Sequence, residues 1–114
     1  MRKKVDSYLG FATKSRNLVS GYHSCLHGMK QKKIKLLILS EDLSENTVKK
    51  LSKVAELEEI PIRIYGKTEE LSKITSSSER GAFGITDVKF ADAIIKEIDA
   101  EHNNERMEVF VCPE

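Results

Sequence analysis

The chain has 114 residues, 39% of them hydrophobic and 32% charged. That length is typical of one domain with its own core, and the composition is too apolar for a disordered chain and too polar for a membrane protein. The net charge is +1, but residues 1–40 hold nine basic residues and one acidic residue, whereas residues 41–114 hold 10 basic and 17 acidic residues.

Two amphipathic helices are predicted in the first third of the chain. Apolar residues recur at helical spacing over residues 5–15 and again after Gly21, with a short connecting segment at residues 17–20. The apolar face of the second helix holds Tyr22, Cys25, Leu26 and Met29, and its opposite face holds His23, Ser24, His27 and Lys30.

A strand, a third helix and a second strand are predicted next. Residues 34–39 are almost continuously apolar, as expected for a buried parallel strand. Ser44 is placed to cap a third helix, which ends near Glu59. Pro61 then keeps the chain extended before a short strand at residues 62–64.

The second half of the chain continues this alternation. Thr68 is placed to cap a fourth helix, and Ser76, Ser77 and Ser78 form an exposed loop before a strand over residues 83–86. Apolar residues at positions 90, 91, 94, 95 and 98 predict a last helix. The pattern predicts an α/β fold, a three-layer α/β/α sandwich with a small mixed β-sheet.

The end of the chain is predicted to lie outside that domain. Residues 102–106 form a polar break, and the sequence GluValPheValCys at 108–112 is typical of an edge strand or a docked tail. We therefore expect one domain over residues 1–100 and a separate tail over residues 101–114.

Cysteine use and hydropathy predict a cytoplasmic protein. Cys25 and Cys112 lack CxxC spacing, so we expect both to remain thiols, with a disulfide between them as the alternative. No apolar run reaches the roughly 20 residues that span a bilayer, and the N-terminus is amphipathic, so no membrane partner is expected.

No residue pattern predicts catalysis or a metal site. His23 and His27 share a helix face, as two metal ligands would, but Cys25 belongs to the apolar face and His102 is remote in sequence. Zinc takes three or four converging protein ligands, so we expect no bound metal. Cys25 is expected to be buried and therefore inert as a nucleophile.

Two further features are interpreted as structural. Glu41 and Asp42 follow a buried strand, where α/β folds often place ligands, but carboxylates there also stabilise a helix N-terminus, and we favour that role. Gly81 and Gly84 form neither a dinucleotide fingerprint nor a phosphate loop, so no cofactor is expected.

The basic first third of the chain points to a partner. Its net charge is +8, whereas that of the remainder is −7. Clustered basic residues create a positive potential that attracts phosphate backbones, although the same residues could form only a solvated surface. Charge alone leaves both interpretations open.

Four segments resemble one known family in their order along the chain. They are LeuValSerGly at 18–21, LysIleLysLeuLeuIleLeuSerGluAsp at 33–42, IleProIle at 60–62 and GluLeuSerLys at 70–73. Over about residues 5–98 the chain resembles the ribosomal L-seven-Ae family of kink-turn RNA-binding proteins, especially its bacterial YlxQ-type members. The resemblance implies the α/β/α sandwich and RNA binding without catalysis.

The resemblance also implies which residues contact RNA. Family members bind bent RNA through the N-terminal end of the second helix and a loop before the last strand. Gly21 matches the glycine that opens the first region, and the family's Asn, Glu and Lys are replaced by His23, Ser24 and His27. The second region corresponds to residues 76–80, with Ser76, Ser77 and Arg80 as its candidate contacts.

We therefore expect a non-enzymatic RNA-binding protein that associates with ribosomal or other structured, kink-turn-like RNA, with ribosomal proteins as further partners. Lys35 is excluded from the site because it interrupts the strand pattern. Since Asn, Glu and Lys are all replaced, the alternative is a protein-interaction module that has kept the fold and lost specific RNA recognition. The expected electrostatic anchors are Lys14, Arg16, Lys30, Lys32 and Lys33.

Overall fold

Helices and strands alternate along residues 3–77 and 81–110, the residues that the structure, a computed structural model, describes. Their order is α1 (Lys3–Lys14), β1 (Leu18–Ser20), α2 (Tyr22–Lys30), β2 (Leu36–Leu39), α3 (Glu45–Leu57), β3 (Ile62–Ile64), α4 (Thr68–Ile74), β4 (Ala82–Ile85) and α5 (Val88–Phe110).

The strands form one mixed sheet in the order β1-β4-β2-β3. β4 runs antiparallel to both β1 and β2, and β2 runs parallel to β3. Ile85 pairs with both Leu18 and Leu36, whereas Ala82 pairs with Leu39. One end of the sheet therefore holds the starts of β1 and β2 and the end of β4. The opposite end holds the ends of β1 and β2 and the start of β4.

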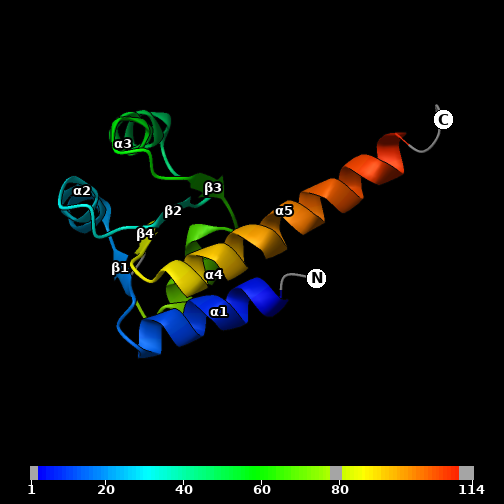
Figure 1. The fold of residues 1–114 in the computed structure, drawn as a ribbon, viewed down its shortest axis with the longest axis horizontal. Helices are drawn as coiled ribbons and strands as arrows, with labels where there is room; N and C mark the ends of the chain where they lie inside the picture. The colour runs from blue at the N-terminus through cyan, green and yellow to red at the C-terminus, as the bar shows by residue number, and fades with distance from the viewer. Residues whose placement is uncertain (1–2, 78–80, 111–114) are drawn as a thin grey trace.

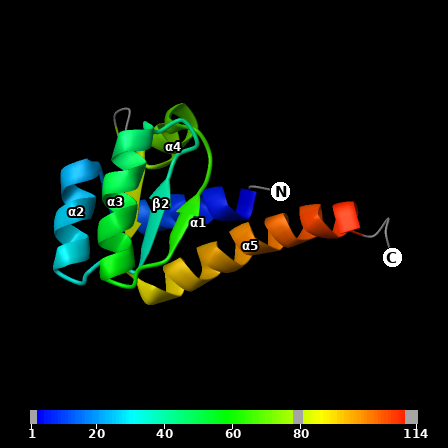
Figure 2. The same cartoon turned by 90° about the horizontal axis from the view of Figure 1, so that it is seen from above.

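Helices cover both faces of this sheet, α2 and α3 on one and α1, α4 and α5 on the other (Figures 1 and 2). Alternating side chains of β2 contribute to both cores, since Leu36 and Ile38 pack with α1, α4 and α5, whereas Leu37 and Leu39 pack with α2 and α3. All four are fully buried. The predicted three-layer α/β/α sandwich with a small mixed sheet is confirmed.

β1 is the element that the periodicity did not predict, since residues 17–20 were expected to be only a connecting segment. A three-residue strand is too short to show a repeat in its sequence. β1 forms because it pairs with β4, far along the chain, with Val19 opposite Gly84. Tertiary pairing therefore determines this strand.

Helix capping agrees with the prediction at α3 and differs at α4. The Ser44 hydroxyl accepts a hydrogen bond from the Thr47 amide at 3.3 Å, as expected of an N-cap. The prediction that Thr68 caps α4 was wrong, because the N-cap is Lys67 and Thr68 is the first helical residue. The Thr68 amide donates to Asp42 Oδ1 at 3.0 Å, so a carboxylate from the loop after β2 serves this helix start.

α5 is longer than predicted and runs beyond the rest of the sandwich (Figure 2). The expected polar break at 102–106 and the expected strand from residue 108 were wrong for the residues up to Phe110, which are helical. Polar residues are compatible with a helix, and no glycine or proline interrupts the sequence after Gly84 until Pro113. Residues 111–114, including Cys112, lie outside the described residues.

None of the described helices combines the length and apolarity that crossing a bilayer requires.

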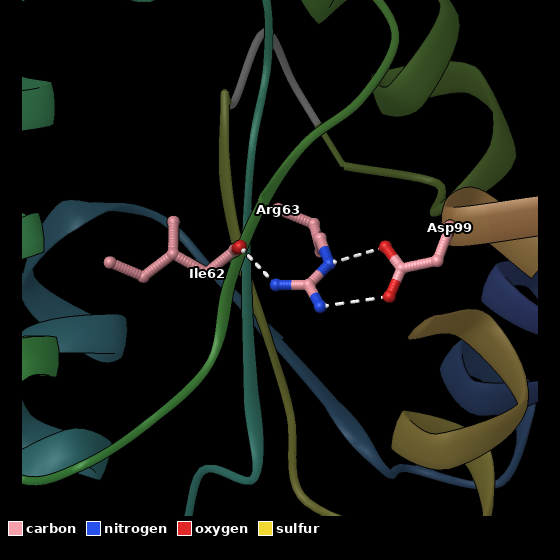
Figure 3. Close-up of polar contacts among 3 residues, drawn as sticks. All are labelled: Ile62, Arg63 and Asp99. Atoms are coloured by element: carbon pink, nitrogen blue, oxygen red, sulfur yellow. Dashed lines mark hydrogen bonds and ion pairs between the residues drawn. The ribbon is translucent and has the colours of Figure 1, made fainter. Parts of the chain in front are cut away.

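Arg63 joins the edge strand β3 to α5 (Figure 3). Its Nε and Nη2 donate to the two carboxylate oxygens of Asp99 at 2.9 and 3.0 Å, and its Nη1 donates to the Ile62 carbonyl at 2.8 Å. The Pro61 carbonyl faces β2, so the alternation of backbone groups turns the Ile62 carbonyl toward the open edge. The guanidinium thus occupies an acceptor that another strand would otherwise use.

Candidate nucleic-acid interface

The N-terminal end of α2 lies at the end of the sheet where β4 begins. The Gly21 amide donates to the Ala82 carbonyl at 2.8 Å, and the Gly21 carbonyl accepts from the Cys25 amide at 3.0 Å. Gly21 has φ 98° and ψ 157°, a conformation that essentially only glycine adopts. Gly21, the N-cap, has no side chain that could accept a hydrogen bond from the first amides of α2. These amides and the positive end of the helix dipole are therefore available to a ligand.

The candidate contact residues of α2 are exposed on the helix. His23 and Ser24 lie in the first turn, and the His23 ring packs edge-on against Tyr22 with 5.1 Å between ring centroids. His27 follows about one turn later on the same side. We call this surface the α2 N-terminal end, and it comprises Gly21, His23, Ser24, His27, Ser76 and Ser77.

The loop before β4 returns to this same end of the sheet. Ser76 is exposed, and its amide and that of Ser77 donate to carbonyls at the end of α4, at 3.4 and 3.0 Å. The chain then reaches Gly81, whose carbonyl accepts from the Ser40 amide at 2.8 Å. Arg80, also predicted to contact RNA, lies outside the described residues. The loop and the start of α2 are therefore neighbours through the paired ends of β1, β4 and β2.

Ser40, Asp42 and Thr68 form a hydrogen-bonded group that supports this end and that the sequence did not reveal. The Thr68 hydroxyl lies 3.0 Å from Ser40 Oγ and donates to Asp42 Oδ1 at 2.8 Å. Hydrogen bonds from Thr68 and Ser40 lower the pKa of the Asp42 carboxyl to about 2. A Cβ at Gly81 would lie 2.7 Å from Ser40 Oγ, so Gly81 lies directly against this group. The prediction that Asp42 stabilises a helix N-terminus is therefore confirmed, and the helix is α4.

The predicted electrostatic anchors lie at the other end of the sheet. The Thr86 amide donates to the Asn17 carbonyl at 2.9 Å, and the Lys35 amide donates to the Ile85 carbonyl at 2.6 Å. These bonds place the end of α1 and the end of α2 on either side of the end of β4. The expected single RNA site is thus divided, because five of its residues lie here: Lys14, Arg16, Lys30, Lys32 and Lys33.

Two more lysines join these anchors. Lys35, which was not expected in the site, is exposed, and its ammonium donates to the Lys32 carbonyl at 3.4 Å. Lys89 is exposed in the first turn of α5, which follows β4 at this end. We call the set the basic end, and it comprises Lys14, Arg16, Lys30, Lys32, Lys33, Lys35 and Lys89. Only the three-dimensional pairing of the strands shows that Lys89 belongs with the others.

The remaining candidates for chemistry are the two histidines of α2 and Cys25. Within the part of the chain that the structure describes, no group of three or more His, Cys, Asp or Glu side chains could hold a metal ion. Cys25 is a free, fully buried thiol, and burial raises its pKa to about 12. The thiolate is the nucleophilic form, so the inertness predicted for Cys25 is consistent with its position.

Comparison with known proteins gives a consistent set of relatives. The model of the ribosomal protein L7Ae/L30e/S12e/Gadd45 family matches residues 3–95. The chain is 29% identical to the RNA-binding protein YlxQ of Bacillus subtilis over 91 residues, which are 80% of this chain and 91% of that protein. It is equally identical to the YlxQ protein of Enterococcus faecium, over 79% of this chain and 86% of the relative.

Two solved structures share the fold. A Bacillus halodurans C protein of unknown function superposes with a TM-score of 0.81 at 29% identity, over 84% of this chain and 97% of the other. The Giardia lamblia 15.5kD RNA binding protein superposes with a TM-score of 0.72 at 16% identity, over 84% of each chain. At that identity the Giardia structure supports the fold alone.

Proposed function

Because the chain belongs to the ribosomal protein L7Ae/L30e/S12e/Gadd45 family, we propose that it is a non-enzymatic protein that binds structured RNA of the kink-turn type, including ribosomal RNA. The YlxQ relatives are named RNA-binding proteins, which supports this function. The family resemblance assigns RNA contact to the start of the second helix and the loop before the last strand. The described parts of both segments lie at the same end of the sheet.

The observation that carries the proposal is the geometry of Gly21. Its glycine-specific conformation turns the chain from β1 into α2 so that the uncapped amides of the first turn face outward beside the start of β4. Backbone amides at a helix N-terminus bind phosphate groups well. The arrangement is suited to a phosphate of a bent RNA strand, with His23 and Ser24 beside it.

The side chains at this end favour phosphate contact over base discrimination. His23 and Ser24 each offer a donor and an acceptor, whereas Asn and Glu at these positions would make the family's base-edge contacts. The imidazole of His27 attracts phosphate less than a lysine ammonium does. Since phosphate contacts carry no sequence information, we propose RNA binding with weak kink-turn selectivity.

The same replacements favour a second candidate function, a protein-interaction module that keeps the fold without RNA binding. All three of the family's contact residues are changed, and the exposed carboxylates of Glu41 and Asp42 lie near the same end of the sheet. Saturable, salt-sensitive RNA binding by the wild-type chain would argue against this module.

Restoring the family's residues is expected to increase selectivity for a kink-turn. The variant His23→Asn, Ser24→Glu, His27→Lys regains base-edge contacts, and one good bidentate contact contributes about 1–3 kcal/mol of discrimination. The preference for a kink-turn RNA over a straight duplex should therefore rise by roughly 5-fold to 150-fold. Titrations of both RNAs with wild type and variant at one salt concentration measure this ratio.

A matched control tests whether introducing one glutamate and one lysine elsewhere on the surface also changes the preference for a kink-turn. Lys49→Glu with Glu56→Lys changes no net charge and alters exposed residues of α3, a helix that supplies none of the residues of the α2 N-terminal end. This control should leave the preference unchanged. Strong selectivity already in wild type would instead show that His23, Ser24 and His27 form an effective motif of their own, and no gain in the variant would mean that the site is wrongly placed.

A further inference from the structure

The basic end gathers charge from three connections that are distant in sequence. Lys14 and Arg16 lie where α1 leads into β1, Lys30 to Lys35 lie where α2 leads into β2, and Lys89 lies where β4 leads into α5. β1 and β2 flank β4, so their starts are about 10 Å apart, two strand spacings. The cations therefore form a broad row along one end of the sheet.

Few acidic groups offset this charge. Among the described residues, four lie in the connections and adjoining helix turns at the same end: Asp87, whose Oδ2 accepts from the Phe90 amide at 3.0 Å, Glu56 in the last turn of α3, and Glu58 and Glu59, which line a pocket with Lys32 and Lys35. Seven basic and four acidic residues give a net charge of +3. All seven cations are exposed, and among the described residues none of them lies within ion-pair distance of a carboxylate.

Helix ends alone do not account for these residues. Basic side chains in the last turn of a helix do stabilise its negative end, and Lys14 and Lys30 are placed to do so. However, α3 also ends here with no basic residue in its last turn, and its C-cap is Glu58, so this end of the fold forms without a cation on every helix. Lys32 and Lys33 lie beyond the end of α2.

The basic end faces away from the α2 N-terminal end. The nine residues of α2 separate the two by about 13 Å, and β1, β2 and β4 each have one terminus at either end. A straight RNA segment bound at the start of α2 therefore lies at the opposite end of the helix from Lys32 and Lys33. An uncapped helix N-terminus at one end of the strands and a row of cations at the other end are suited to two RNA segments.

We propose that the basic end is a second RNA-binding surface, which contacts the phosphate backbone of a duplex segment, so that this protein bridges two segments of folded RNA. The inference rests on the proposed function, since the first segment is the one bound at the α2 N-terminal end. Contacts from lysine and arginine to phosphate carry no sequence information, so we expect binding at the second surface to be independent of sequence.

Charge reversal at the basic end tests this surface with a straight RNA duplex as the probe. Each lost phosphate contact lowers the salt dependence of binding by about one unit of log K against log salt. Lys30→Glu, Lys32→Glu and Lys33→Glu together should lower the slope by about three units and weaken duplex binding at least about tenfold. The matched control is Lys49→Glu, Lys50→Glu and Lys53→Glu, the same charge change on exposed residues of α3, which should lose much less.

A milder variant guards against misfolding, because glutamates at a helix C-terminus oppose its dipole. Lys30→Gln, Lys32→Gln and Lys33→Gln removes the cations without adding anions, and its urea midpoint shows whether the fold is intact. It should still lower the salt slope by about three units. A folded glutamine variant that binds the duplex with the wild-type slope would overturn the proposal.

Bridging is measured by capturing the protein on an immobilised kink-turn RNA and then adding a labelled straight duplex. Wild type and the α3 control should retain the duplex, whereas the basic-end variants should bind the immobilised RNA within severalfold of wild type and release the duplex. Equal retention by the basic-end variants would overturn the second surface. Failure of wild type to bind the immobilised RNA would instead contradict the proposed function, and the duplex titration would still decide the basic end.

Discussion

Replacing Gly21 with alanine is expected to lower the free energy of unfolding by about 1–3 kcal/mol, the usual cost of a side chain in a region of backbone space reserved for glycine. Gly21 is buried, with φ 98° and ψ 157°, and it is fixed between β4 and α2 by its amide and carbonyl hydrogen bonds. The strain is relieved only if the start of α2 shifts. The same variant should therefore also weaken kink-turn RNA binding.

Gly10→Ala provides the matched control. Gly10 lies inside α1, and a Cβ there would meet nothing within 4 Å. Alanine is a better helix former than glycine, so this variant should be more stable than wild type by about 0.5–1 kcal/mol. Urea unfolding of both variants checks the pair, and a Gly21→Ala protein as stable as wild type would show that Gly21 is not conformationally required.

Gly84→Ala is expected to destabilise the fold by about 1–3 kcal/mol through overpacking. A Cβ at Gly84 would lie 2.5 Å from Ile34 Cδ1, and a Cβ at Gly28 would lie 2.9 Å from the same atom. Ile34 is 2% exposed and fills the space between α2 and β4, so it has nowhere to move. These two glycines make room for the Ile34 side chain between α2 and β4.

If Gly84→Ala acts by overpacking, the effect of Ile34→Val on stability should change sign between the wild-type and Gly84→Ala backgrounds. Ile34→Val removes the Cδ1 atom, and in wild type that deletion should cost about 0.5–1.5 kcal/mol. In the Gly84→Ala background it should increase stability, because it removes the closest clash. Ile38→Val makes the same deletion on the opposite face of β2 and should cost the same in both backgrounds. An equal cost for Ile34→Val in both backgrounds would contradict the overpacking.

The elements that the sequence predicted are those with a long apolar repeat. α1, α2 and α3 each bury one helical face, and β2 is buried on both sides, so their patterns are set locally. β1 was missed because its three residues form a strand only by pairing with β4. The length of α5 was missed because the loss of apolar periodicity was interpreted as the end of the helix.

The sequence identifies the candidate residues of the site but does not show that they divide between the two ends of the sheet. Counting charge along the chain grouped Lys30, Lys32 and Lys33 with the start of α2, only a few residues earlier. A helix carries the chain to the opposite end of the sheet in nine residues, so neighbours in sequence face opposite directions. The Thr68 hydrogen bonds to Asp42 join residues 26 apart and leave no local signal in the sequence.

RNA binding is tested most directly by titrating the wild-type chain against a fluorescently labelled kink-turn RNA at several salt concentrations. The proposed function predicts saturable binding whose affinity falls linearly with salt on a log–log plot, by about 0.7–0.9 units for each phosphate contacted. Loss of that binding in Gly21→Ala, with Gly10→Ala unaffected, would assign it to the start of α2. No saturable binding by the folded wild-type chain at low salt would contradict the function and favour the protein-interaction module.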